Sequence, residues 1–175
     1  LTHSGTGRVA WLTMRPMSLW ESGDSNGKVS VASLFNGEFS PAESVDISLK
    51  ELAFLVSRGG WPGSLELSRN AALLQAMNYL NGVIHSDISR ADNVRRDTIV
   101  SYIQALKKIF VIEDMPAWSP NLRSKTAIRT SDTRYFVDPS IAVAAMAVGP
   151  DDLLNDLNTF GLFFETLAVR DLRVY

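Results

Sequence analysis

The sequence contains no cysteine and only two histidines. The lack of cysteine excludes disulfides, zinc–cysteine sites, iron–sulfur clusters and thiol catalysis. His3 and His85 lie far apart in the sequence, and neither belongs to a set with ligand spacing. A lone histidine supplies too few metal ligands, so we expect no metal site and interpret His85 as a surface or capping residue.

Long apolar runs are also absent. The run from Ile141 to Val148 ends at Gly149 and Pro150, well short of the roughly 18 uncharged residues of a membrane span. We therefore expect no membrane association. The lack of cysteine, in turn, fits a cytoplasmic protein. The chain begins at Leu1 with neither an initiator Met nor a signal sequence, which is typical of the interior of a longer protein.

The sequence lacks the phosphate loop G-x-x-x-x-G-K-[ST], the G-x-S-x-G elbow and the H-E-x-x-H pair. The commonest catalytic signatures are therefore missing. A net charge of −2 and a pI near 5.7 give the whole chain no attraction to nucleic acid, so such binding would need a local basic patch.

What is present is typical of a folded domain. Of the 175 residues, 46% are hydrophobic and 21% charged, which predicts one or two small globular units. Residues 8–14 are rich in strand-forming residues between Gly7 and Pro16, and predict a buried strand. A short helix should follow over residues 17–21, and turn-forming residues predict a loop over 24–27.

Three amphipathic helices are then expected. The first begins with a capping box of Ser48 and Glu51 and ends at Gly59 and Gly60. The second follows W-P-G-S and fades into residues 86–97, and the third is capped by Asp97 or Thr98. The residues expected to face inward on these helices are Leu49, Leu52, Ala53 and Val56, then Ala72, Ala76, Leu80, Val83 and Ile84, then Ile99, Tyr102, Ile103, Leu106 and Phe110.

The third helix leads into two predicted strands, F-V-I-E from Phe110 and R-Y-F-V from Arg134. A helix followed by a two-stranded ribbon is a winged-helix-like pattern. Asp138 should cap a further helix with Pro139 in its first turn, ending at Gly149, before a last helix or pair of helices over 151–173. The residues expected to face inward there are Leu153, Leu154, Leu157, Phe160, Phe164, Leu167 and Ala168.

Basic residues gather beside the second predicted strand. The four are Arg123, Lys125, Arg129 and Arg134. Only Asp132 opposes them, and serines and threonines that suit phosphate contacts lie between them. The segment therefore predicts either a nucleic-acid-binding wing or an ordinary solvated loop.

Two further residues are candidates for chemistry. Arg8 follows S-G-T-G, and its guanidinium could contact a phosphate or pair with a nearby acid at a turn. Glu165 lies among phenylalanines and leucine on an apolar helix, where a carboxylate needs a cation or a metal. No basic residue lies three or four positions after it, so we expect a partly buried Glu165 paired with an Arg, a Lys or backbone N–H groups of another element.

Ordered strings along the whole chain carry a resemblance. They are G-T-G-R-V-A-W-L-T-M-R-P-M-S-L-W-E-S-G, R-G-G-W-P, Y-I-Q-A-L-K-K-I-F-V-I-E-D-M-P-A-W-S-P, L-R-S-K, Y-F-V-D-P-S-I-A and L-N-T-F-G-L-F-F-E-T-L-A-V-R-D-L. Together they resemble bacterial and archaeal ATP-binding proteins in which an AAA-type P-loop domain is followed by the domain of unknown function 4143.

The resemblance implies a mixed, mostly α fold with short β. Residues 1–23 would end the ATPase domain, 24–96 would form its helical lid and linker, 97–138 a winged-helix-like part, and 139–175 the opening helices of a PD-(D/E)XK nuclease-like domain. Relative to that family, the helical segment before Asp97 is short, and we expect residues to be missing between Arg96 and Asp97.

The implied function is the C-terminal part of an ATPase that couples ATP to this effector module. ATP and Mg would bind the parent protein and not this chain, which lacks both Walker motifs. Arg8 would act as an arginine finger or phosphate sensor, and Glu165 would occupy a nuclease-like position without activity. The implied partners are the upstream ATPase domain, DNA and a second copy. The alternative is a protein-interaction or DNA-binding module with no activity of its own.

Overall fold

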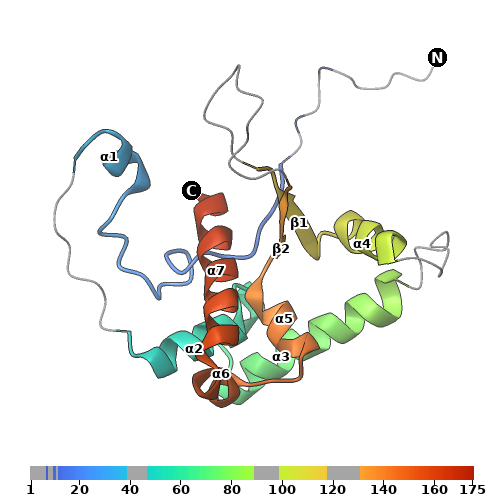
Figure 1. Cartoon of the computed structure of the whole chain (residues 1–175). Coiled ribbons are helices and arrows are strands. Elements are labelled where there is room, and N and C mark those ends of the chain that lie inside the picture. Colours follow the sequence, from blue (N-terminus) through green and yellow to red (C-terminus); the bar gives the residue numbers. More distant parts are fainter. Residues whose placement is uncertain (1–6, 8–9, 11, 39–46, 89–98, 118–130) are drawn as a thin grey trace.

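The computed structural model describes residues 7, 10, 12–38, 47–88, 99–117 and 131–175, and these residues are mostly helical (Figure 1). The α-helices are α1 (Val31–Phe35), α2 (Leu49–Arg58), α3 (Arg69–Gly82), α4 (Ile99–Lys108), α5 (Pro139–Ala145), α6 (Pro150–Asn155) and α7 (Leu157–Val174). A 3-10 helix, η1 (Pro62–Ser64), precedes α3, and a π-helix, η2 (Val83–Ile88), continues it. Strands β1 (Ile112–Met115) and β2 (Thr133–Phe136) form an antiparallel ribbon. The expected mixed, mostly α fold is confirmed for this part of the chain.

The larger core lies between α2, α5, α6 and α7, which gather at one end of the molecule (Figure 1). Its buried members are Ala53, Val56, Ala142, Val143, Leu153, Phe160, Phe163 and Leu167. Small residues on α2 and α5 let the helices approach closely, and the phenylalanines of α7 fill the remaining volume. None of the described helices is long and apolar enough to cross a membrane.

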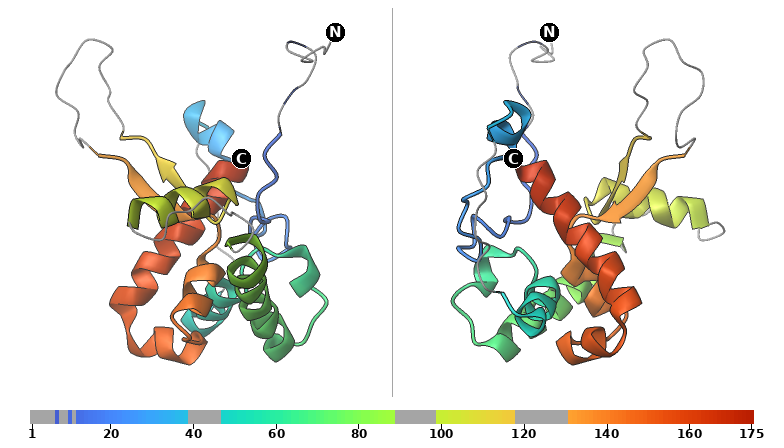
Figure 2. Two further views of the ribbon diagram at one scale, coloured as in Figure 1. Left: turned by 90° about the vertical axis from the view of Figure 1, so that its right-hand side faces the viewer. Right: turned by 60° about the vertical axis from the view of Figure 1, so that its left-hand side comes forward.

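A second core joins α3 and η2 to α4, the ribbon and α5. Val83, Val111, Ile112 and Ile141 are its buried members. In both views of Figure 2 the ribbon projects from the helical body beside α4. Ile112 pairs with Phe136 and Asp114 with Arg134. Because side chains alternate along a strand, Ile112 and Asp114 share one face of β1 and Glu113 and Met115 share the other.

Helix starts follow the local signals. The Ser48 side chain accepts from the Glu51 N–H at the start of α2, and Asp138 caps α5 with Pro139 in the first turn. The Glu51 carboxylate, however, accepts from Arg69 with both oxygens instead of closing a capping box. Helix α5 ends at Ala145, before the expected end at Gly149, and Ala147 has a left-handed φ of 53°.

The predicted N-terminal strand is wrong where it can be judged. Residues 12–14 are in no strand, and Leu12 and Met14 are 93% and 96% exposed. The described sheet contains only β1 and β2, and a strand forms only where its backbone groups find a partner. Residues 19–23 form turns instead of the predicted helix, and α1, with no buried residue, was not predicted.

Several predicted inward faces are also wrong. Leu49, Ile84, Ile99, Tyr102, Phe110, Leu157 and Phe164 are all at least 43% exposed. Strand β1 begins two residues after its predicted start at Phe110, and β2 begins one residue before its predicted start at Arg134. The expected cap at Asp97 or Thr98, and the expected gap before Asp97, lie outside the described residues.

Candidate functional site

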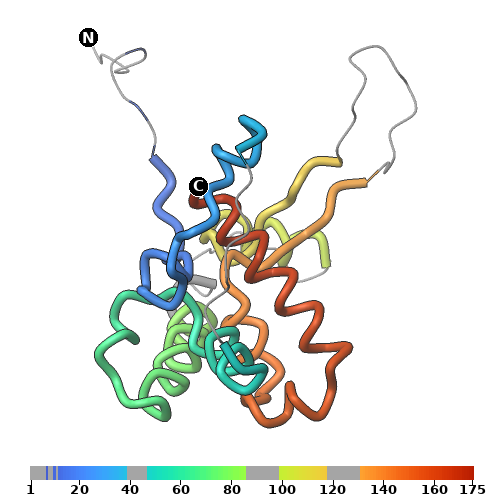
Figure 3. The backbone as a smooth tube through the Cα atoms, turned by 90° about the vertical axis from the view of Figure 1, so that its left-hand side faces the viewer, coloured from blue at the N-terminus to red at the C-terminus, as the bar shows by residue number. Residues whose placement is uncertain are grey.

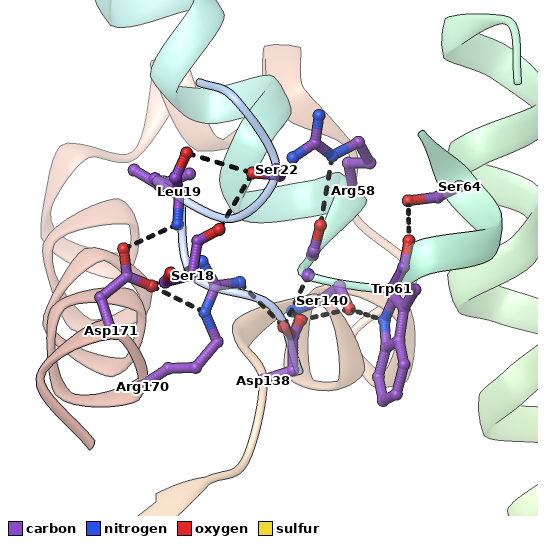
Figure 4. A network of polar contacts seen from close by, with 12 residues as sticks. Ser18, Leu19, Ser22, Arg58, Trp61, Ser64, Asp138, Ser140, Arg170 and Asp171 are labelled. Carbon is purple, nitrogen blue, oxygen red and sulfur yellow. Dashed lines mark hydrogen bonds and ion pairs between the residues drawn. The ribbon is translucent and has the colours of Figure 1, made fainter. Parts of the chain in front are cut away.

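Asp138 lies at the turn between β2 and α5, and none of it is exposed to solvent. Its Oδ1 accepts from the Ser140 N–H and hydroxyl at 2.9 and 2.6 Å. Its Oδ2 accepts from the Gly60 N–H at 2.8 Å and from Arg170 Nη1 at 2.9 Å (Figure 4). Four donors on one buried carboxylate compensate for the loss of its hydration.

Arg170 on α7 is the matching buried cation, with 3% of its surface exposed. Besides Asp138, it donates from Nε and Nη2 to Asp171 Oδ1 at 2.9 and 2.7 Å. Burial acts to lower the pKa of the Arg170 guanidinium, but the charges and hydrogen bonds of Asp138 and Asp171 outweigh it and raise that pKa. The guanidinium is therefore a fixed positive charge within the fold.

An N-terminal strap, residues 17–24, is attached to this ion pair. The Met17 N–H donates to the Gly60 carbonyl at 2.7 Å, and the Leu19 N–H donates to Asp171 Oδ2 at 3.0 Å. Asp24 pairs with Arg58 at 2.7 Å. Figure 3 shows this segment, in blue, lying against the helical body. We call Asp138, Ser140, Arg170 and Asp171, with the Gly60 backbone, the buried junction.

Gly59 and Gly60 are required at the buried junction for steric reasons. Gly59 has a φ of +75°, and a Cβ there would lie 2.3 Å from Asp138 Oδ1. A Cβ on Gly60 would lie 2.1 Å from the Met17 carbonyl oxygen. The two glycines thus do more than end α2, which is the only role that the sequence predicts for them.

Trp61 connects the buried junction to a groove. Its Nε1 donates to the Ser140 hydroxyl at 2.8 Å, and its ring lies against that of Tyr79 with centroids 4.3 Å apart. The Trp61 groove has a volume of about 540 Å³. It is lined by Thr13, Met14, Arg15, Pro16, Trp61, Pro62, Tyr79, Lys107, Phe110, Ile112, Glu113, Asp114 and Val137.

Two adjacent carboxylates on β1 organise the charge at this groove. Glu113 pairs with Arg15 and Arg173. Asp114 pairs with Lys107 and, at 2.9 Å, with Arg134. Hydrogen bonds from Arg134 and then Lys107 lower the pKa of Asp114. Each carboxylate therefore faces two cations, and the cluster carries an excess of positive charge.

Of the predicted site residues, the structure describes Arg134 and Glu165. Arg134 is exposed on β2 and pairs with Asp114. Arg8, Arg123, Lys125 and Arg129 lie outside the described residues. Their proposed roles stay predictions.

The expectation of a partly buried Glu165 is wrong. The residue is exposed on α7. Among the described residues its carboxylate accepts from the Tyr135 hydroxyl at 2.6 Å, and not from a cation or a backbone N–H. Phe164 beside it is also exposed, so this side of α7 lies outside the core. Within the described part of the chain, no group of three or more His, Asp or Glu side chains could hold a metal ion. His85 has an exposed side chain, as expected.

Comparison with known proteins gives one match. Residues 81–152 match the model of a family described as domain of unknown function DUF8612. This segment runs from the end of α3 into α6 and includes the ribbon, Asp138 and both β1 carboxylates. No curated protein and no solved structure matches the chain.

The resemblance to AAA-type ATP-binding proteins is therefore wrong. The match is to DUF8612, and neither an AAA family nor the domain of unknown function 4143 is detected. Two of the strings behind the resemblance, R-G-G-W-P and D-P-S, have a structural explanation, because they form the buried junction. Short strings of this kind report local packing needs and do not specify a whole family.

The sequence did not point to Arg170, Asp171 or Trp61. A signal for the first was present, since an arginine among Phe163, Leu167 and Val169 on an apolar helix needs a buried partner. Arg170, and not Glu165, is the buried charged residue of α7 that needs such a partner.

Proposed function

We propose that the chain is a DNA-binding module with no catalytic activity of its own, in which α4 and the β1–β2 ribbon contact the phosphate backbone. The order of elements supports this, because a helix followed by an antiparallel ribbon is the arrangement of a winged helix. Helix α4 ends with Lys107 and Lys108, which place positive charge next to the ribbon.

The distribution of charge carries the proposal. Residues 99–137 contain six Lys and Arg against three Asp and Glu, a net charge of +3 in a chain whose total is −2. Phosphate contacts from Lys and Arg provide most of the sequence-independent affinity for DNA. A basic unit in an otherwise acidic chain would therefore bind DNA through this region alone.

The contacts of the ribbon fit this function. Arg134 has a side chain that is 44% exposed, so it can reach a phosphate while Lys107 continues to neutralise Asp114. Lys108 is exposed at the end of α4. In the sequence between the two strands, Arg123, Lys125 and Arg129 contribute three further positive charges, and residues 118–130 contain no Asp or Glu.

Fluorescence anisotropy with a labelled duplex of about 20 base pairs tests the proposal. We expect log K to fall linearly with log salt, with a slope of about −0.9 for each phosphate contact. The ribbon variant is R123Q/K125Q/R129Q, and the charge-matched control is K28Q/K50Q/R69Q, whose residues are exposed outside residues 99–137.

The ribbon variant should weaken binding and flatten the salt dependence by about one slope unit per lost contact. The control should bind as the unmodified chain does. Undetectable binding, salt-insensitive binding, or equal effects of the two variants would refute the proposal.

A further inference from the structure

The Trp61 groove is a cavity whose walls are formed by several elements that are far apart in the sequence. Its walls come from the residues before the strap, the turn after α2, helix α3, the end of α4 and β1. The hydrogen bond from Trp61 to Ser140 ties the floor to the buried junction. A volume of about 540 Å³ lies within the range of about 300–1,000 Å³ that small organic ligands occupy in proteins.

The floor of the groove is aromatic and apolar. The Trp61 and Tyr79 rings meet at 4.3 Å with a tilt of 33°, and Pro62, Ile112 and Val137 extend the apolar surface. Because the indole N–H is already bonded to Ser140, the Trp61 ring presents apolar surface in a fixed orientation. Such a surface suits a flat aromatic ring, which can stack against it with offset geometry.

The rim of the groove has more positive than negative charge. Arg15, Lys107, Glu113 and Asp114 line it, and the two carboxylates also pair with Arg173 and Arg134 from outside the lining. The four cations thus exceed the carboxylates by two. The side chains of Arg15 and Lys107 are 25% and 28% exposed, which leaves them accessible while reducing their screening by water.

We propose that the Trp61 groove binds a small organic anion with an aromatic body, with its ring on Trp61 and Tyr79 and its acidic group between Arg15 and Lys107. The excess of cations makes this possible without leaving a buried charge unpaired. If Arg15 turns toward the ligand, Glu113 keeps Arg173, and if Lys107 turns, Asp114 keeps Arg134. The groove shares Lys107 and β1 with the proposed DNA-binding surface, but its assignment does not rest on that proposal.

Anilinonaphthalene sulfonate is a suitable probe because it joins an aromatic body to one sulfonate, and N-phenylnaphthylamine is its neutral counterpart. Titrations of the full chain, followed by fluorescence and calorimetry, should show one sulfonate site per chain. We expect Arg15→Gln with Lys107→Gln to weaken binding of the anionic probe about tenfold or more, because two charge-assisted contacts are lost. Binding of the neutral probe should change less than about twofold, because it uses only the apolar floor.

The matched control is Arg69→Gln with Lys108→Gln. Arg69 pairs with Glu51 between α2 and α3, and Lys108 lies beside Lys107 without lining the groove. This variant should keep the affinity for both probes and, through Lys108, weaken DNA binding. The groove variant should melt cooperatively, since each β1 carboxylate keeps one cation.

A second measurement needs no substitution. Raising the salt concentration should weaken binding of the sulfonate and leave binding of the neutral probe unchanged. Failure of the sulfonate to bind, binding that resists both salt and the Arg15 and Lys107 substitutions, or equal losses for the two probes would overturn the assignment.

Discussion

Asp138 allows a sharp test of what holds this fold together. In Asp138→Asn the shape of the side chain is kept while its charge is lost. In the unmodified protein, one carboxylate oxygen accepts from the two Ser140 donors and the other accepts from the Gly60 N–H and Arg170. Whichever way the new amide is turned, its NH₂ group faces one of these pairs, and two buried donors lose their acceptor.

The expected cost follows from that count. An unsatisfied buried donor costs about 1–3 kcal/mol, so two of them cost about 2–6 kcal/mol. In other proteins, removing one partner of a buried ion pair costs about 3–5 kcal/mol, which lies within this range. Because Arg170 keeps Asp171, we expect Asp138→Asn to lower the free energy of unfolding by about 3–5 kcal/mol.

Urea unfolding followed by circular dichroism measures this loss. Asp156→Asn is the matched control, because Asp156 also caps a helix, α7, but is exposed. Asparagine caps helices as well as aspartate does, so the control should lose less than about 1 kcal/mol. Equal losses for the two variants would show that the buried charge is not what stabilises the junction. In a double-mutant cycle, Asp138→Asn with Arg170→Met should cost less than the sum of the single changes.

Gly60→Ala should lower the free energy of unfolding by about 1–3 kcal/mol, because the new Cβ would overlap the Met17 carbonyl. Gly161→Ala, whose Cβ would meet nothing within 4 Å, should raise it by about 1 kcal/mol. Thermal melts compare the two variants, and similar shifts in melting temperature would contradict the steric argument. Arg134→Gln should raise the pKa of Asp114, measured by NMR titration of its carboxyl group. Because the pKa of Asp114 is lowered in the folded protein, the Asp114–Arg134 pair stabilises the fold at pH values above the unfolded-state pKa. This contribution is lost as the pH falls through the folded-state pKa. An unchanged Asp114 titration in the variant would refute the role of Arg134 in lowering this pKa.

The sequence predicts those features that depend on neighbouring residues. The caps at Ser48 and Asp138 and the glycine after Arg58 are signals within a few positions of the helix they define. The helix-to-ribbon order of α4, β1 and β2 also follows from local residue types. Boundaries are less well defined, since Phe110 was expected in a strand but adopts a left-handed φ of 57° before β1.

Features that depend on distant residues were not predicted. Residues 12–14 have the composition of a strand, but composition cannot show whether a partner strand lies beside them. The Asp138 contacts reach Gly60 and Arg170, 78 and 32 positions away. The groove likewise needs Arg15 and Glu113, which are 98 positions apart. No periodicity within one segment reports such pairs.

The wide spacing of the junction residues determines how the chain can be divided. Expressed alone, the segment 81–152 that matches DUF8612 would contain Asp138 but neither Gly60 nor Arg170. Its carboxylate would lose the amide and the guanidinium that compensate its burial, and Ala142, Val143 and Leu153 would lose the covering surfaces of α2 and α7. The recognisable family segment and the unit that folds are therefore different lengths of chain, and fragments cut at the family boundaries should aggregate.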